Sequence, residues 1–492
     1  MNKNGSQAPL WNLQKLKKLF VNSSDVQLQE HRFAEIESSE ILLIYAEGLC
    51  DSKQIGKDIL PDLKKVYDSS GFGQYNSEQY FGTLPLIPLP DDSSEDFIVE
   101  SVFQGDLLLF FPQTNSLFKM NICNLPGRTP QESSTEISIK GPKDGFTEEI
   151  VTNIALIRKR IRSNSLCYET TIIGRRTRTK VGLLFIDDII SPQVLGEIRK
   201  RLKKVDIDGL YSIGQLEELL GDVKYSLFPL IDFTGRPDYA VAALLAGRFV
   251  LIVDGNPFAL IAPAGFSLIL KSPEDIHFNF QYVSFARLIR LASFWLSGFL
   301  PGFWVSIAAF HQDQIPFRLM ATIAVARLGL PFTAQIEMLL LLLLLEIFRE
   351  AGVRLPSSIG QTLTVVGGLI IGDASIRAGL VSPSVVVVGA ITAVSGVTLV
   401  NQTLSTVLSV IRLSVFIICS ILGLYGLILS IILLVFYMSK LQSFGVPYLS
   451  PLSPPIPKDI LKSFLRGPWS KMRSRPRVLN TMDSDHQGED KS

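Results

Sequence analysis

The chain has 492 residues, 19% of them charged, and a net charge of only +1 at pH 7. This length exceeds one ordinary domain, and the small net charge indicates no particular partner. The mean hydropathy of +0.30 and the low charged fraction argue against a wholly soluble protein. The four cysteines form no CxxC pair, which excludes an obvious zinc motif and favours a reducing compartment.

The average composition conceals a division of the chain into three parts. Residues before Phe285 have ordinary globular composition, whereas Ala378–Ile411 and Leu413–Ser439 contain no Asp, Glu, Lys or Arg. The sequence therefore predicts a soluble N-terminal region, an α-helical polytopic membrane domain over 285–439, and a basic, partly disordered cytoplasmic tail over 440–492. Met1–Glu40 is polar and contains no cleavable signal peptide, so the soluble region is expected to stay cytoplasmic.

The soluble region is predicted to be α/β, with one subdomain over residues 1–138 and a second over 139–284. In the first, apolar β-rich runs predict strands at Glu40–Tyr45, Phe97–Val102 and Asp106–Phe111. In the second, apolar periodicity, N-cap signals and a hairpin turn predict further elements. These are helices over Thr147–Ile161, Pro192–Lys204 and Arg236–Ala246, and strands at Val181–Ile186, Arg248–Val253 and Phe258–Ala262.

Four apolar segments of the membrane domain are long enough to cross a hydrocarbon layer of ~30 Å. They are Leu291–Phe310, Phe332–Phe348, Leu380–Val400 and Leu413–Met438. Ile315–Leu330 and Ile359–Ala374 are shorter and predict partial helices. Basic residues are abundant after Lys440, which places the tail in the cytoplasm, and an even number of full spans places the N-terminus there too.

The soluble region contains no recognisable catalytic constellation. GxxxxGK[ST], GxSxG and HExxH are all absent from the sequence, so neither an enzyme nor a cofactor or metal site is predicted. The basic stretch Arg175–Lys180 would suit nucleic acid or lipid head groups. It lacks interleaved aromatic residues, so a solvated loop or a subunit contact is favoured and no nucleic-acid partner is expected.

Charged side chains within the apolar segments are the main candidates for function. Each costs at least ~2.5 kcal/mol in a bilayer unless it finds a partner, water or the interface. Glu346 and Arg349 are three residues apart and can pair on one helix face, so a snorkelling pair is an equal alternative. The other charged candidates are Glu337, Asp373, Arg377 and Arg412.

A glycine-rich segment precedes Asp373 and is the best candidate for lining a pathway. Gly367, Gly368 and Gly372 permit irregular backbone, which at membrane depth is tolerated only against protein or water. The same glycines would also permit close packing of ordinary helices. Both interpretations remain open on the sequence alone.

Many separated segments together resemble one known family. They are Lys140–Phe146, Thr152-Asn153 with Arg158, Arg236–Asp238, Leu244–Arg248, Val253–Leu260, Ser272–Asp275, Leu300-Pro301, Phe310-His311, Pro331-Phe332, and Glu346–Pro356 with Gly360–Thr362. Over about residues 35 to 450 the chain resembles the A subunit of the GerA-type spore germinant receptors of endospore-forming bacteria.

The resemblance implies a multi-pass protein of the inner spore membrane that acts with a transporter-like B subunit and a C-subunit lipoprotein. It implies that the B subunit holds the nutrient, whereas A subunits oligomerise and pass the signal as ion flow. One departure is Asp373, which stands where relatives tend to have an uncharged residue. A secondary transporter, suggested by the broken helices, is the alternative, although no inverted repeat is apparent.

Overall fold

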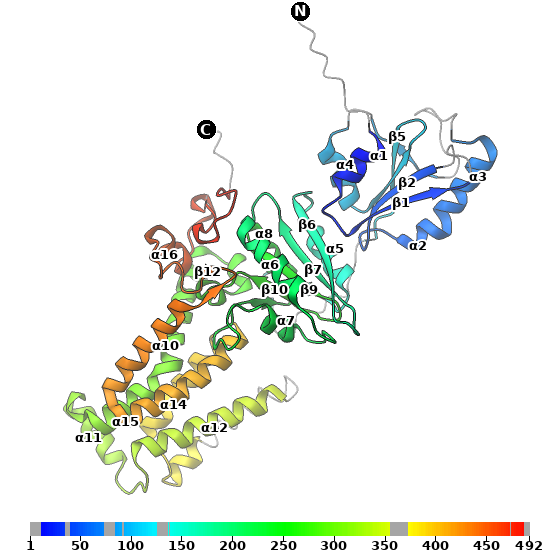
Figure 1. Ribbon diagram of the computed structural model, residues 1–492. Helices are drawn as coiled ribbons and strands as arrows, with labels where there is room; N and C mark the ends of the chain where they lie inside the picture. Colours follow the sequence, from blue (N-terminus) through cyan, green and yellow to red (C-terminus); the bar gives the residue numbers. More distant parts are fainter. Residues whose placement is uncertain are drawn as a thin grey trace, which may run out of the picture. The chain divides into compact units, whose positions relative to one another are not determined.

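The computed structural model describes residues 11–34, 40–72, 84–90, 93–124, 136, 138–354, 372–472 and 474–486. The chain forms two compact units (Figure 1). Unit 1 comprises residues 1–224, 231–263 and 472–492, and unit 2 comprises residues 225–230 and 264–471. The predicted fold class is confirmed: the N-terminal part is α/β with antiparallel sheets, and the later part is helical with apolar helices.

The first sheet of unit 1 has the strand order β1-β2-β4-β5-β3, and every neighbouring pair is antiparallel. One face is covered by helices α1 and α4, and the other by α3, so each face has its own apolar core. The elements are β1 (Val26–Arg32), β2 (Glu40–Ala46), β3 (Ile87–Pro88), β4 (Asp106–Phe111), β5 (Ser116–Asn121), α1 (Leu13–Leu19), α2 (Ser52–Gln54), the π-helical η2 (Ile55–Ile59), α3 (Leu60–Ser70) and α4 (Glu95–Phe103).

The prediction of a strand at Phe97–Val102 is wrong, because this segment lies within α4. The Ser94 hydroxyl accepts a hydrogen bond from the Phe97 amide, which is a helix N-cap, and Glu95 and Asp96 stand in the first turn. Ile98, Val102 and their neighbours then bury one face of the helix against the sheet. The strands predicted at 40–45 and 106–111 are confirmed as β2 and β4.

The second sheet of unit 1 has the order β6-β7-β9-β10-β8, again antiparallel throughout. Gly182 faces Ile150 of α5, whereas Phe185, on the opposite face of β7, lies beneath Arg199 of α6. Helices therefore cover both faces, and the predicted elements are confirmed. They are α5 (Ile150–Arg158), β6 (Leu166–Ile173), β7 (Thr179–Ile186), α6 (Pro192–Lys204), α7 (Ile213–Leu220), β8 (Asp232–Thr234), α8 (Pro237–Leu245), β9 (Phe249–Val253) and β10 (Ala259–Ala262).

The end of the chain folds back onto this second sheet region. Residues 474–486 belong to unit 1, in which Met482 donates its amide to the Ile189 carbonyl over 3.0 Å. The buried Arg475 donates to the Leu245 carbonyl over 2.9 Å, and Leu479 is 3% exposed. The first described residues and residues 474–486 therefore belong to the same unit, and this described part of the tail is packed.

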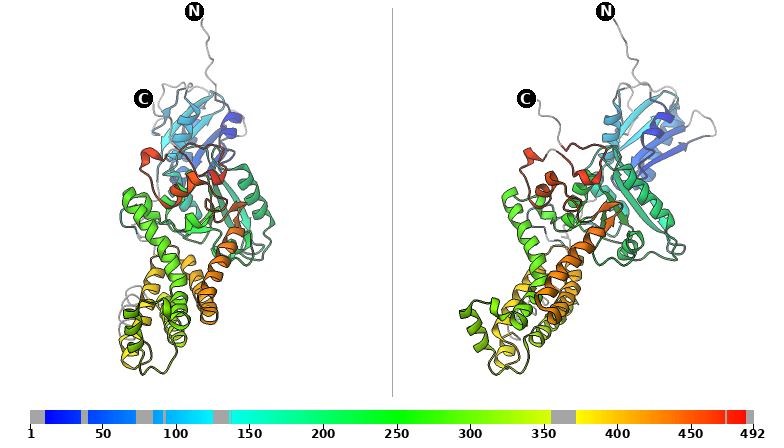
Figure 2. Two further views of the ribbon diagram at one scale, coloured as in Figure 1. Left: turned by 90° about the vertical axis from the view of Figure 1, so that its left-hand side faces the viewer. Right: turned by 60° about the vertical axis from the view of Figure 1, so that its left-hand side comes forward.

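Unit 2 consists mainly of helices. They are α9 (Phe266–Ile269), α10 (Phe280–Phe310), α11 (Phe317–Ala326), α12 (Ala334–Arg354), α14 (Pro383–Val397), α15 (Gln402–Lys440) and α16 (Pro457–Phe464). Among the described residues, α10 and α15 are long and apolar enough to cross a membrane. In both views of Figure 2, α10, α14 and α15 lie together in one bundle. Its core contains Val305, Met338, Leu341, Val385 and Phe416.

Helix α15 contains a reversal at Gly423, whose φ of 59° and ψ of −141° are not helical. The part of α15 before Gly423 runs in the same direction as α10. Gly298 contacts Leu408, Gly302 contacts Cys419, and Phe310 contacts Gly423. After it, a Cβ on Gly426 would come within 2.8 Å of the Ile418 carbonyl oxygen, so the two halves fold onto each other. The predicted single span over 413–438 is thus two antiparallel segments joined by one glycine.

Candidate functional site

The two halves of unit 1 are joined through one fully buried arginine. The Arg158 guanidinium donates from Nε to Asp25 Oδ2 over 2.8 Å and from Nη2 to Asp25 Oδ1 over 3.0 Å. It also donates to the Ser23 hydroxyl over 3.3 Å and lies 4.0 Å from the centroid of the Phe103 ring. A bidentate pair of this kind fixes orientation as well as distance.

The backbone preceding β1 makes the same connection. Ser24 donates its amide to the Tyr168 carbonyl, and Tyr168 donates its amide to the Asn22 carbonyl, each over 3.0 Å. Ser23 therefore forms a parallel bridge with Tyr168 in β6. The first subdomain thus extends the edge of the second sheet, and Arg158 holds the junction together from α5.

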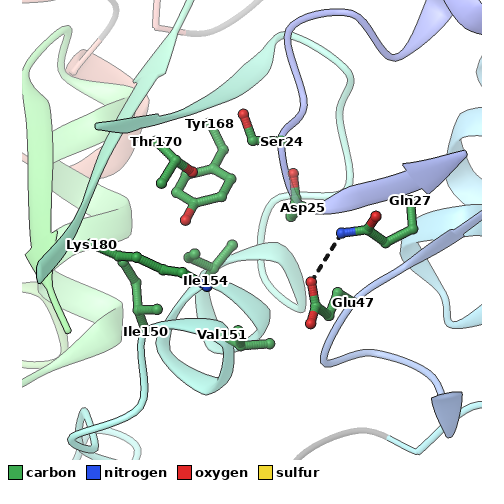
Figure 3. Close-up of a pocket in the computed structure, with 10 residues that line it drawn as sticks. All are labelled: Ser24, Asp25, Gln27, Glu47, Ile150, Val151, Ile154, Tyr168, Thr170 and Lys180. Atoms are coloured by element: carbon green, nitrogen blue, oxygen red, sulfur yellow. Dashed lines mark hydrogen bonds between the residues drawn. The ribbon is translucent and has the colours of Figure 1, made fainter. Parts of the chain in front are cut away.

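A pocket of about 140 Å³ opens beside this connection (Figure 3). Its wall combines acidic and amide side chains from the first subdomain with apolar, aromatic and basic side chains from the second. The lining residues include Asp25, Gln27, Glu47, Ile154, Tyr168 and Lys180. Gln27 Nε2 donates to Glu47 Oε2 over 3.1 Å, the one hydrogen bond drawn between the residues in Figure 3.

The size and lining of the pocket limit what it can hold. Its volume corresponds to roughly four or five waters at ~30 Å³ each, far below the ~300 Å³ of a drug-sized site. Acidic Glu47 and basic Lys180 both line it, so it matches a small polar or zwitterionic solute in charge. No residue in it forms a nucleophile–base pair with a neighbour among the described hydrogen bonds.

A second polar cluster lies at the edge of the second sheet. Glu136 Oε2 accepts hydrogen bonds from the Thr234 hydroxyl over 2.6 Å and from the Gly235 amide over 3.1 Å. Burial raises the pKa of Glu136 to about 7, although both hydrogen bonds oppose the rise. Asp232 nearby accepts from the Tyr239 hydroxyl over 3.3 Å, and burial raises the pKa of that tyrosine well above its usual value.

Neither cluster has the composition of a metal centre. Across the residues that the structure describes, no group of three or more His, Cys, Asp or Glu side chains could hold a metal ion. The basic stretch predicted as a solvated loop or subunit contact is partly neutralised within unit 1. Arg175 pairs with Asp206, and Arg176 lies 3.8 Å from Asp208.

In unit 2, Glu337 is completely buried near the N-terminal end of α12. Its Oε2 accepts the Ser382 amide over 3.0 Å, at the N-terminus of α14, where the helix dipole favours an anion. Its Oε1 lies 3.4 Å from Arg327 Nη2, beyond ideal hydrogen-bond distance. The carboxylate therefore connects the end of α11 with α12 and α14.

Glu346 lies nine residues further along α12 and contacts a different helix. Nine residues rotate a helix by half a turn, so Glu337 and Glu346 face opposite sides. Arg412 Nη2 of α15 donates to Glu346 Oε2 over 3.0 Å and to the Ser409 hydroxyl over 3.1 Å. Arg349 pairs with the other oxygen of Glu346, as the spacing predicted. One carboxylate thus serves two arginines.

The remaining predicted residues lie around the start of α14. Asp373 and Arg377 form an i,i+4 ion pair over 2.8 Å, and both side chains are largely exposed. A Cβ added to Gly372 would lie 3.6 Å from the Val386 side chain. Gly367 and Gly368 lie outside the described residues.

Sequence reasoning missed two connections that the fold creates. Asp25 and Arg158 are 133 positions apart, and Arg412 meets Glu346 across 66 positions. A signal existed for the second connection alone: Arg412 is the single charge between two uncharged runs. Such a residue requires a partner, but its identity depends on helix packing.

Comparison with known proteins covers almost the whole chain. The family model described as Bacillus/Clostridium GerA spore germination protein matches residues 14–478. Spore germination protein XA of Bacillus anthracis is 42% identical over 95% of this chain and 95% of its own length. Spore germination protein KA of Bacillus subtilis (strain 168) is 36% identical over 97% of this chain and 88% of its own length.

A solved structure is similar to the N-terminal half. It is the crystal structure of the N-terminal domain of the A subunit of the Bacillus megaterium spore germinant receptor GerK3. The match is 31% identical, covers 52% of this chain and 94% of that domain, and has a TM-score of 0.38.

Proposed function

Because the chain belongs to the GerA family of spore germination proteins, we propose that it is the A subunit of a nutrient-responsive spore germination receptor. In this proposal it works with a transporter-like B subunit and a C-subunit lipoprotein, and several copies oligomerise. It transduces nutrient binding as a gated ion conduit and has no enzymatic turnover. The family name and the titles of the relatives support the germination role.

The charged contacts of α12 are the observation that supports conduction. This helix carries the fully buried Glu337 towards α14 and the partly exposed Glu346 towards the buried Arg412 of α15. Buried charges at such depth are costly, and in membrane proteins they commonly mark ion paths or coupled elements. A helix held by ion pairs on two opposite faces can shift only if both contacts rearrange, which suits a gate.

The segment before α14 is proposed to lie near the shared axis of the oligomer. Asp373 and Arg377 are largely exposed in the single chain, so replacing either charge should cost little stability. Gly367, Gly368 and Gly372 are proposed to give the path its irregular backbone. If that segment proved to be ordinary packing, the proposed path would lie around Glu337 instead.

The proposed location is the inner spore membrane, crossed several times with both termini on the cytoplasmic side. Two apolar helices of sufficient length and a relative titled membrane protein support membrane association. The described residues nearest the two ends, from Trp11 and up to His486, belong to unit 1, which supports both ends lying on one side. Cysteine labelling at Asn2 and Ser492 from one side of the membrane tests this, and labelling of one end alone would contradict it.

Deletion of the gene tests the function directly. Spores without it should lose ion release and germination in response to at least one nutrient of a panel, and the restored gene should return both. Asp373→Asn should alter ion release more than receptor abundance, since an exposed pair contributes at most ~1 kcal/mol. Asp313→Asn, in the exposed 3-10 turn η4 (Gln312–Gln314), is the matched control.

A secondary transporter remains the second candidate, because α15 is interrupted at Gly423 as discontinuous transporter helices are. Uptake of a labelled nutrient that continued in membranes holding this chain alone would favour the transporter. Neighbouring genes for B and C subunits, and nutrient-triggered ion release without uptake, would favour the receptor.

A further inference from the structure

The segment that follows the last helix of the bundle is hydrogen-bonded to both stretches through which the chain enters unit 2. The first stretch, residues 225–230, is a short insertion between two parts of unit 1, and the second begins at Ala264. The segment from Tyr437 to Tyr448 contacts both stretches, and all of these contacts lie within unit 2.

Ser443 is the centre of this arrangement and is 1% exposed. Its hydroxyl donates to the Leu230 carbonyl over 2.6 Å and accepts the Ala264 amide over 3.1 Å. One hydroxyl therefore satisfies a buried carbonyl from one stretch and a buried amide from the other. Because such groups are costly to leave unpaired, a movement of either stretch is opposed by Ser443.

Two tyrosines extend the contact. Tyr437, near the end of α15, accepts the Leu227 amide on its hydroxyl over 2.9 Å, and its ring lies 6.2 Å from that of Phe228. Tyr448 is fully buried, and its ring lies 5.8 Å from Phe228 while its carbonyl accepts the Phe266 amide over 2.8 Å. The end of α15 and the segment after it, from Tyr437 to Tyr448, thus contact both stretches.

We propose that Tyr437 and Ser443 form a transmission joint through which rearrangement of the N-terminal domain moves the last helix of the bundle. The proposal rests on the proposed receptor function and deepens it. Residues 225–230 are joined covalently to unit 1 at both of their ends, and Ala264 follows directly after Pro263 of unit 1. A displacement of these junctions is therefore passed to Tyr437 and Ser443 through their hydrogen bonds. Both are positioning residues and contact no nutrient.

The test compares variants of the complete receptor in spores that lack the native gene. Tyr437→Phe removes the acceptor of the Leu227 amide and keeps the ring, and Ser443→Ala removes the bridging hydroxyl. The controls are Tyr425→Phe, an exposed tyrosine of the same helix segment, and Ser439→Ala, whose hydroxyl bonds only to the Phe436 carbonyl at the surface.

Ser443→Ala should lower the maximal rate of nutrient-triggered ion release about tenfold, the equilibrium effect of roughly one lost buried hydrogen bond. Tyr437→Phe should lower that rate severalfold, because the hydrogen bond that it removes lies at the surface. The half-saturating nutrient concentration and the receptor amount should stay as in the wild type. Should Ser443→Ala fail to accumulate, the isosteric Tyr437→Phe still decides the matter. Wild-type maximal rates in Tyr437→Phe, or a change confined to the half-saturating concentration, would overturn the proposal.

A second measurement separates this proposal from the receptor function on which it rests. If the restored wild-type gene gave no nutrient response, the receptor function would fail. Hydrogen exchange of the purified full chain then tests the joint without depending on the nutrient response. Ser443→Ala should speed exchange in residues 225–230 and around Ala264 together, and unchanged exchange in either stretch would overturn the joint.

Discussion

Replacing Arg158 by methionine tests whether one ion pair holds the two halves of unit 1 together. Arg158 is fully buried, and its partner Asp25 is 5% exposed. Methionine fills much of the same volume but cannot neutralise the carboxylate. The substitution therefore leaves a buried charge without its main partner, which is the costly half of breaking such a pair.

The magnitude follows from the cost of breaking a buried ion pair. Breaking a buried pair by removing one partner costs about 3–5 kcal/mol. The penalty should therefore lie near 3–4 kcal/mol, and loss of the contact between Arg158 and the Phe103 ring adds to it within that range.

Hydrogen exchange of the full chain measures this penalty where it acts. The Ser24 and Tyr168 amides donate across the connection, so their exchange reports separation of the two halves. A penalty of 3–4 kcal/mol should speed their exchange about 10²- to 10³-fold, since each 1.4 kcal/mol is tenfold. Amides in the centre of β9 should change less, because that strand lies within one half.

The double variant Arg158→Met with Asp25→Leu supplies the control. Replacing both charges by apolar side chains is often neutral, so this variant should recover most of the lost protection. The reasoning is refuted if Arg158→Met speeds exchange less than about tenfold, or if the double variant is no better than the single one.

Three further predictions follow from the described contacts. Gly423→Ala should lower the free energy of unfolding by ~1–3 kcal/mol, because the backbone conformation at this position favours glycine and a Cβ would lie 3.2 Å from Phe310. The thermal midpoint measures this loss, and Gly467→Ala is the control, because a Cβ there would meet no atom within 4 Å. Glu346→Gln should lower that midpoint more than Asp373→Asn, because Glu346 neutralises Arg412 and Asp373 is exposed. Because the folded pKa of Glu136 is raised from 4.5 to about 7, its folded form holds the proton more tightly. Its contribution to stability should thus be lost as pH rises from about 4.5 to about 7, and Glu136→Gln should remove that part of the pH dependence of the thermal midpoint.

Local signals were sufficient for most of the second sheet region. The uncharged run at Val181–Ile186 forms β7, and Ser191 with Pro192 marks the start of α6 as the N-cap pattern predicted. Asp254-Gly255 joins β9 and β10 as a hairpin. Each of these depends on neighbours within a few positions, so no tertiary information was needed.

The strand predicted at Phe97–Val102 shows where apolar content misleads. Phe97, Ile98, Val99 and Val102 suit a strand by composition, but the Ser94 cap and two acidic residues in the first turn favour a helix. Glu100 and Gln104 then pair four positions apart on the solvent side. The helical period was present in the sequence and was outweighed by β propensity.

The candidate sites were less predictable than the fold because they depend on packing. Glu346 with Arg349 followed from a spacing of three, and their pairing is confirmed. Arg412 could be identified as needing a partner, but only the approach of α15 to α12 decides that the partner is Glu346. The Gly423 reversal leaves a weak trace, two glycines three apart in an apolar run longer than one crossing needs.

The position of the termini constrains how the bundle can cross a membrane. The chain leaves unit 1 after Pro263 and returns to it at Met472, so a membrane crossed between those points must be crossed an even number of times. The described helices between those points include α10, α12, α14 and the two halves of α15, and the even-number rule applies to those segments that span. If α15 were a single span, Tyr437 would end far from Leu227, whereas the two are hydrogen-bonded. The reversal at Gly423 therefore brings the last segment of α15 back towards residues 225–230 and the joint at Ser443.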